Sequence, residues 1–145
     1  MKLIQPSINT AAMRTVPRET NDCTVRALMA AAGISYDEAH ATMRRHGRKN
    51  GQGTRHDTQV AAYAEHGGKL KAIFGSTKGA RYRANKCDDV PHVDGITLGT
   101  LIKEMPLGRF ICIMRGHAFA IINRQLADGG ALKAGTRIQA VYRFD

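Results

Sequence analysis

The sequence contains no stretch near the roughly 18 uninterrupted apolar residues that a transmembrane helix requires, so we expect no membrane partner. Its first residues have a single lysine and no apolar run, which predicts that no secretory signal is present. Only three cysteines occur, Cys23, Cys87 and Cys112, and no two of them form a Cys-x-x-Cys pair. An odd number of scattered cysteines argues against a disulfide framework and a zinc ribbon, and for a reducing, cytoplasmic compartment.

Acidic residues are scarce: 12 Asp and Glu stand against 22 Lys and Arg, a formal net charge of +10. This surplus favours an acidic partner, which could be a nucleic acid, another polyanion or an acidic protein. A basic protein without such a partner would have the same composition. The 145 residues, 43% of them hydrophobic, suit one globular domain, which we place at residues 21–145 behind an extended N-terminal arm at 1–20.

The first two thirds of the domain show helical periodicity. Apolar residues from Val25 predict a helix that begins near Cys23 and ends at Gly33. Ser35 and Glu38 form a capping box for a second helix. A third helix is expected from Thr54 or Asp57 to His66, and a short fourth one at 97–104. Three residues of the third helix are predicted to face inward: Val60, Ala61 and Ala64.

The last third of the chain is of β type. We expect strands at 109–114 and 117–122, joined by a turn at Arg115-Gly116, and another strand at 137–144. Leu70 to Phe74 is a further strand candidate, and 75–95 is expected to be a loop. The final strand is predicted to present one face, consisting of Ile138, Ala140, Tyr142 and Phe144. Helices followed by an antiparallel sheet predict an α+β fold.

Cys23 follows Asn21 and Asp22, two good capping residues, and so lies at the start of the first helix. The positive end of a helix dipole and its free backbone N–H groups stabilise a thiolate. The Asp22 carboxylate would oppose this effect if it pointed toward the sulfur. A buried, unreactive thiol is the alternative role for a lone cysteine.

His117 opens a strand directly after a turn, at the rim of the expected sheet, where it can face the N-terminus of a helix. A second turn at Asn123-Arg124 reverses the chain direction, so that Asp128 is expected to lie beside His117 on the neighbouring antiparallel strand. A carboxylate beside an imidazole fixes its tautomer and supports its charged form. These residues therefore suggest a nucleophile, a base and an orienting carboxylate, although His117 and Asp128 would also suit ordinary turns.

The residues around these two positions resemble papain-like cysteine peptidases. The resemblance rests on Asn21-Asp22-Cys23-Thr24-Val25-Arg26-Ala27-Leu28 and on Gly116-His117-Ala118-Phe119-Ala120-Ile121-Ile122. It is greatest to small phage- and prophage-encoded proteins related to bacteriocin-processing peptidases, and it covers residues 19 to 144. It implies a papain-like fold, no cofactor, and a location in the cytoplasm of a bacterial host or in the virion.

The resemblance also implies roles for single residues: Cys23 as nucleophile, His117 as general base and Asp128 as orienter, with Asn123 as a second candidate orienter. The family takes one oxyanion donor from a glutamine shortly before the cysteine, and here no glutamine stands between Pro17 and Asp22. Asn21 could supply this donor, or Gln5 could return through the arm. Losing one such donor lowers the rate by about 10²–10³-fold.

Other side chains suggest weaker sites. Cys87 and His92 are too few to predict a metal site, and no metal is expected. His40, His46, His56 and His66 do not share a helical face and are expected at the surface. A basic cluster could contact a polyanion or simply be solvated: Arg44, Arg45, Arg48 and Lys49.

Two functions are consistent with these features. In the first, the protein is a phage-type cysteine peptidase or thiol hydrolase that cleaves a peptide or isopeptide bond of a peptide or protein, and its basic surface favours an acidic one. In the second, a catalytically inactive papain-like scaffold binds nucleic acid or a protein through its basic surface.

Overall fold

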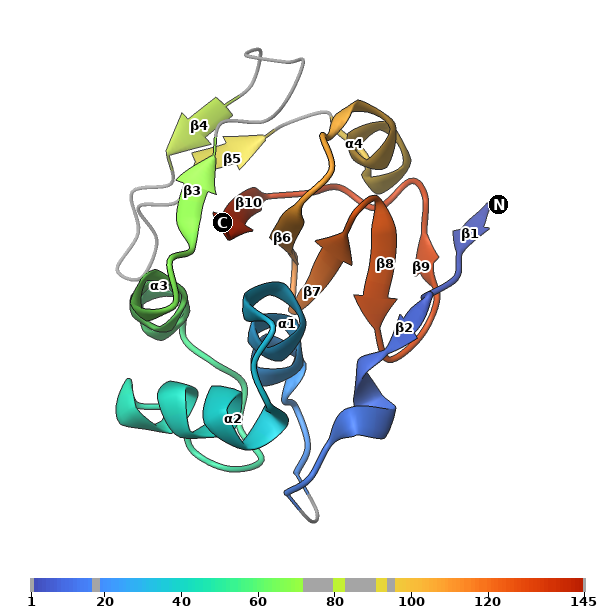
Figure 1. Ribbon diagram of the computed structural model, residues 1–145. Coiled ribbons are helices and arrows are strands. Elements are labelled where there is room, and N and C mark those ends of the chain that lie inside the picture. The colour runs from blue at the N-terminus through green and yellow to red at the C-terminus, as the bar shows by residue number, and fades with distance from the viewer. Residues whose placement is uncertain (1, 17–18, 72–79, 83–90, 94–95, 145) are drawn as a thin grey trace.

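A central sheet of six strands organises the fold (Figure 1). The computed structural model describes residues 2–16, 19–71, 80–82, 91–93 and 96–144. In this part of the chain the strand order is β2-β8-β7-β6-β10-β3, with β2 parallel to β8 and every other pair antiparallel. The bounds are β2 Ile8–Asn9, β3 Lys69–Lys71, β6 Arg109–Met114, β7 His117–Ile122, β8 Gln125–Asp128 and β10 Ala140–Phe144. The predicted α+β class is confirmed.

Two short strand pairs flank this sheet. β1 (Leu3–Ile4) pairs with β9 (Leu132–Lys133), and β4 (Ala80–Tyr82) pairs with β5 (Pro91–Val93). The expected loop at 75–95 therefore contains two strands. The expected N-terminal arm also contains regular elements: β1, β2 and the 3₁₀ helix η1 at Thr10–Met13.

Capping residues mark the end of α1 and the start of α2. α1 spans Cys23–Ala32 and ends at Gly33, whose φ of 68° suits glycine. α2 spans Tyr36–Arg45, and the Ser35 hydroxyl accepts the Glu38 backbone N–H at its start. α3 is His56–Glu65 and α4 is Leu98–Glu104. Within the described residues, no helix is both long enough and apolar enough to cross a membrane.

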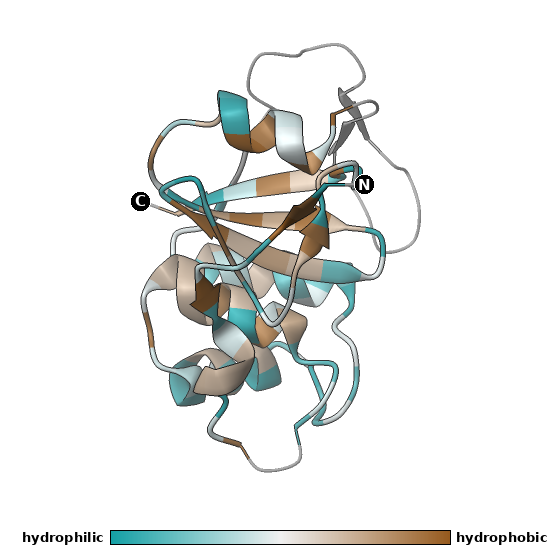
Figure 2. Cartoon of the chain, turned by 90° about the vertical axis from the view of Figure 1, so that its right-hand side faces the viewer, coloured by the Kyte–Doolittle hydropathy of each residue, from teal (hydrophilic) through white to brown (hydrophobic). Residues whose placement is uncertain are grey.

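Both faces of the sheet are covered, so the molecule has three layers (Figure 2). α1, α2 and α3 lie on one side of the sheet, with α1 directly against β6, β7 and β8, and Ala140, Tyr142 and Phe144 face this side. α4 packs on the other face, against Phe110, Cys112 and other residues. Because successive strand residues alternate between two buried faces, β6 and β7 are apolar along most of their length.

Two predictions about inward-facing residues are wrong. Ile138 precedes β10 and packs in the α4 layer, because the period of two holds only within the strand itself. In α3, Val60 is 40% exposed and Ala61 and Ala64 are exposed as well. The inner face of α3 consists instead of Gln59, Ala62 and Tyr63.

Candidate active site

Cys23 is the first residue of α1, and its half-buried thiol lies at the helix N-terminus. The helix begins there although the Asp22 side chain makes no capping bond. This carboxylate instead accepts hydrogen bonds from Arg14, Arg26 and Tyr36, at 2.7–3.0 Å. Its charge is therefore neutralised by two arginines rather than directed against the thiol.

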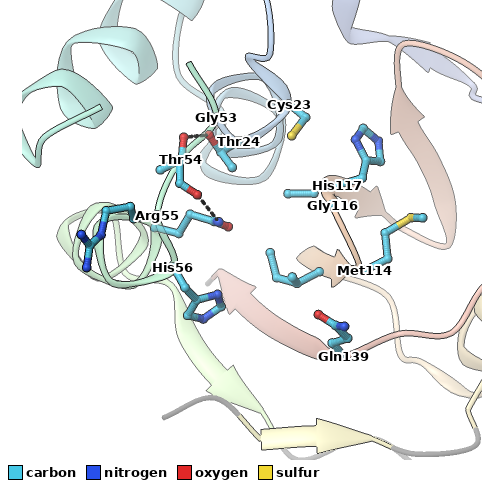
Figure 3. A pocket seen from close by; sticks show the side chains of 13 residues that line it. Cys23, Thr24, Gly53, Thr54, Arg55, His56, Met114, Gly116, His117 and Gln139 are labelled. Carbon is cyan, nitrogen blue, oxygen red and sulfur yellow. Dashed lines mark hydrogen bonds between the residues drawn. The ribbon is translucent and has the colours of Figure 1, made fainter. Parts of the chain in front are cut away.

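His117 begins β7 and lies beside Cys23 (Figure 3). The two-residue turn Arg115-Gly116 precedes it, and Gly116 has a φ of 75°, which a glycine adopts readily. The Phe119 ring stacks on the imidazole at a centroid distance of 6.0 Å. The ring is thus fixed at the rim of the sheet, next to the start of α1.

Asp128 ends β8, and its Oδ2 accepts a hydrogen bond of 2.7 Å from His117 Nε2. Asn123 and Arg124, with φ of 48° and 66°, form the turn that joins β7 to β8. The register Ala120–Ala127 then brings Asp128 to a position diagonal to His117. Because Asp128 occupies Nε2, Nδ1 is the ring nitrogen left for Cys23.

The pKa values of the pair shift toward a thiolate and an imidazolium. Burial raises the pKa of Cys23, but hydrogen bonds from His117 and from the Ala118 backbone, with the charges of His117 and Arg26, bring it below its usual value. Burial also lowers the pKa of His117, whereas its bonds to Asp128 and Cys23 raise it to about 9. Cys112 is fully buried, and burial raises the pKa of its thiol.

Two pockets meet at Cys23 and His117. The first, here called the Thr54-side pocket, has a volume of about 450 Å³ and lies between the loop before α3 and the ends of β6, β7 and β10. Its lining includes Thr54, His56, Met114 and Gln139 (Figure 3). Gln59 lines the same pocket. The second, the Arg14-side pocket, measures about 400 Å³. Cys23, Gly53, Gly116 and His117 line both, so a chain lying in them would pass over the sulfur.

The loop beside the pair is tied to α1 by hydrogen bonds. The hydroxyls of Thr24 and Thr54 lie 2.5 Å apart. Asn21 Nδ2 donates to the Gly51 carbonyl at 3.0 Å, which uses one of the two N–H groups of its amide. Asn21 also lines the Arg14-side pocket with Cys23, whereas Gln5 lines a separate groove beside β1 and α4. Of the two proposed oxyanion donors, the structure brings only Asn21 to Cys23.

Asn123 lies at the opposite end of β7 from His117, where its Oδ1 accepts the Gly108 N–H at 3.0 Å. It does not reach the imidazole. Asp128 is therefore the only one of the two predicted orienters that contacts His117.

The predicted basic cluster does not form one surface. Arg48 is 5% exposed and donates to both carboxylate oxygens of Glu19, at 3.0 and 3.1 Å. Arg45 pairs with Glu65 at the surface, and Arg44 and Lys49 are exposed. His40, also expected at the surface, is 8% exposed and bonds to Glu19 at 2.7 Å. Arg48 and His40 thus lie inside rather than at the surface, because the buried Glu19 carboxylate needs hydrogen-bond partners.

Several residues of the site carried no recognisable signal in the sequence. Arg26 bonds to Asp22 and Asp128, and the latter lies 102 positions away. His56 lines the Thr54-side pocket and bonds to the Tyr142 hydroxyl at 3.1 Å. The spacing of Arg26 three residues after Cys23 places both on α1 but does not indicate a partner on β8.

Comparison of the chain with protein-family models, curated proteins and solved structures gave no match. In the described residues, no three His, Cys, Asp or Glu side chains are grouped so that they could hold a metal ion, and Cys87 lies outside these residues.

Proposed function

We propose that this protein is a papain-like thiol hydrolase that cleaves a peptide or isopeptide bond through Cys23, His117 and Asp128. The observation that carries the proposal is that the Cys23 thiol lies beside His117, whose ring is hydrogen-bonded to Asp128, at a helix N-terminus where two pockets meet. These are the parts of an activated nucleophile: a thiol, its base and the group that orients the base.

The reaction would follow from these positions. The Cys23 thiolate attacks the carbonyl carbon, and the new C–S bond produces a tetrahedral oxyanion near the Cys23 N–H, which has no partner within the helix. Asn21 supplies a second donor. The His117 imidazolium then protonates the leaving amine as the C–N bond breaks, which leaves a thioester. Neutral His117 next takes a proton from water, the resulting hydroxide attacks the thioester, and the C–S bond breaks to release the acid.

The charge of the site favours an acidic or acceptor-rich substrate. Among the residues that the structure describes, the lining of the Thr54-side pocket includes Arg55 and His56 and no carboxylate. In the Arg14-side pocket, the two carboxylates, Glu19 and Asp22, are buried and paired with arginines. A net charge of +10 adds long-range attraction for such substrates. We place the protein in a phage life cycle, within the host cytoplasm or the virion.

Competitive alkylation tests the proposal. The folded protein is treated with limiting iodoacetamide at pH 6.5, and mass spectrometry then measures the modification of Cys23 and Cys87 in the same sample. We expect Cys23 to react at least tenfold faster, and His117→Ala to remove this advantage. Denatured protein, in which both thiols should react alike, is the control. Equal rates in the folded protein would contradict the proposal and favour the inactive binding scaffold, whose nucleic-acid affinity should then fall steeply with salt.

A further inference from the structure

Arg26 connects the candidate catalytic carboxylate to a buried ionic cluster. It lies on α1 three residues after Cys23, and its Nη1 is 3.4 Å from Asp128 Oδ1. The other oxygen of the same carboxylate, Oδ2, is bonded to His117. Each oxygen of Asp128 therefore has its own partner, which defines the rotation of the carboxylate group.

The guanidinium of Arg26 is itself held by two further contacts. Its Nε donates to Asp22 Oδ1 at 3.0 Å, and its Nη1 donates to Thr10 Oγ1 at 3.0 Å. Asp22 is 1% exposed and is fixed in turn by Arg14 and Tyr36. A planar guanidinium bound along several of its N–H groups has little freedom to move. Thr10 and Arg14 come from the N-terminal 20 residues, so this segment contributes to the support of the site.

A side chain at position 129, next to Asp128, would crowd the Arg26 guanidinium. A Cβ at Gly129 would lie 2.9 Å from Arg26 Nη1 and 3.2 Å from the Ala11 Cβ. A Cβ at the following glycine, Gly130, would meet nothing within 4 Å. An added methyl group should therefore displace the Arg26 guanidinium at position 129 but not at position 130.

We propose that Arg26 is a positioning residue of the active site: held by Asp22 and Thr10, it fixes the Asp128 carboxylate in the rotation that bonds His117. This inference rests on the proposed function, in which Asp128 orients the catalytic base. In addition, the Asp128 carboxylate is itself held in its orientation by Arg26, which lies on the same helix, α1, as Cys23. The residue before the nucleophile, Asp22, then serves as the anchor of that cation.

The direction in which the His117 pKa changes when Arg26 is removed distinguishes a positioning role of Arg26 from a simple effect of its charge. If Arg26 acted only as a nearby cation, its removal would relieve repulsion and raise the His117 pKa. If Arg26 positions Asp128, its removal loosens the Asp128–His117 bond, and the His117 pKa should fall by about one unit. The imidazole pKa can be followed directly by NMR titration of the folded protein.

The test therefore compares Arg26→Gln, Gly129→Ala and the matched control Gly130→Ala, each checked for folding by circular dichroism. We expect the first two to lower the His117 pKa and to slow alkylation of Cys23 at pH 6 about tenfold, with Gly130→Ala like the parent. Gly129→Ala retains the charge, so it also tests the proposal if Arg26→Gln does not fold. An unchanged or raised His117 pKa in the folded variants would overturn the role of Arg26. The proposed function fails separately, if Cys23 of the parent protein has no advantage over Cys87.

Discussion

The Glu19 carboxylate and the Arg48 guanidinium form a two-bonded ion pair inside the protein, with distances of 3.0 and 3.1 Å. The same carboxylate accepts the Gly51 N–H at 2.7 Å, and Arg48 also donates to the Thr20 carbonyl. The pair therefore fastens the segment just before Cys23 to the loop that borders both pockets. Arg48, which the sequence suggested as a surface contact for polyanions, instead helps to shape the site.

Glu19→Gln should destabilise the protein by about 3–5 kcal/mol at pH 7, because it leaves the buried Arg48 cation without a counter-charge. The partners of Glu19 outweigh its burial and lower its pKa from 4.5 to about 2. The pKa of Glu19 is lower in the folded than in the unfolded protein. The Glu19 carboxylate therefore contributes fully to the free energy of unfolding above about pH 4.5, and this contribution disappears as the pH falls toward 2.

Urea unfolding between pH 2 and 7 measures this contribution. The parent protein should lose stability steeply between pH 4.5 and 2, and Glu19→Gln should show a shallower loss there. Glu65→Gln is the matched control, since Glu65 pairs with Arg45 at the surface and should contribute little. Equal stability of the parent and Glu19→Gln at pH 7 would contradict the structural role of the pair.

Local chemistry made a good part of the fold predictable. Gly33 and Ser35 defined the end of α1 and the start of α2, and both act through their own backbone or hydroxyl. β6 and β7 have the predicted bounds, because a turn with Gly116 separates two apolar runs. The sequence also placed Asp128 near His117, because the turn at 123–124 determines the register of β8.

Interactions between distant segments could not be predicted in this way. In α3, Gln59 is buried because its side chain bonds to the Tyr63 hydroxyl and the Thr54 carbonyl, whereas Val60 faces solvent. Hydrophobicity alone predicts the reverse. Similarly, His40 and Arg48 lie inside because Glu19, 21 and 29 positions away, accepts their hydrogen bonds.

The contact between His117 and Asp128 predicts a large effect of Asp128→Asn. An amide at this position removes the charge that supports the His117 imidazolium and can favour the wrong tautomer. We expect the rate of substrate cleavage to fall by roughly 10²–10⁴-fold. Asn123→Ala, at the far end of β7, should change the rate far less, and comparable losses in both variants would contradict the assignment of Asp128 as orienter.

The packing of α1 on the sheet predicts a strong effect of Leu28→Ala on stability. Leu28 is fully buried in the layer between the helices and the sheet. Truncation to alanine removes buried methyl groups and leaves a cavity, so we expect a loss of about 2–5 kcal/mol in chemical unfolding. Leu107→Ala is the control: Leu107 is 63% exposed, and its truncation should leave the unfolding midpoint nearly unchanged.

The shifted pKa values of Cys23 and His117 predict a bell-shaped pH dependence of kcat/KM. The rate should rise as Cys23 loses its proton, at a pH below the usual thiol pKa, because His117 and the Ala118 N–H stabilise the thiolate. It should fall near pH 9, where His117 loses the proton that the leaving amine requires. In Asp128→Asn the falling limb should move to lower pH, since that variant lacks the carboxylate that raises the His117 pKa. A falling limb at the same pH in both proteins would show that His117 is not the acid of the reaction.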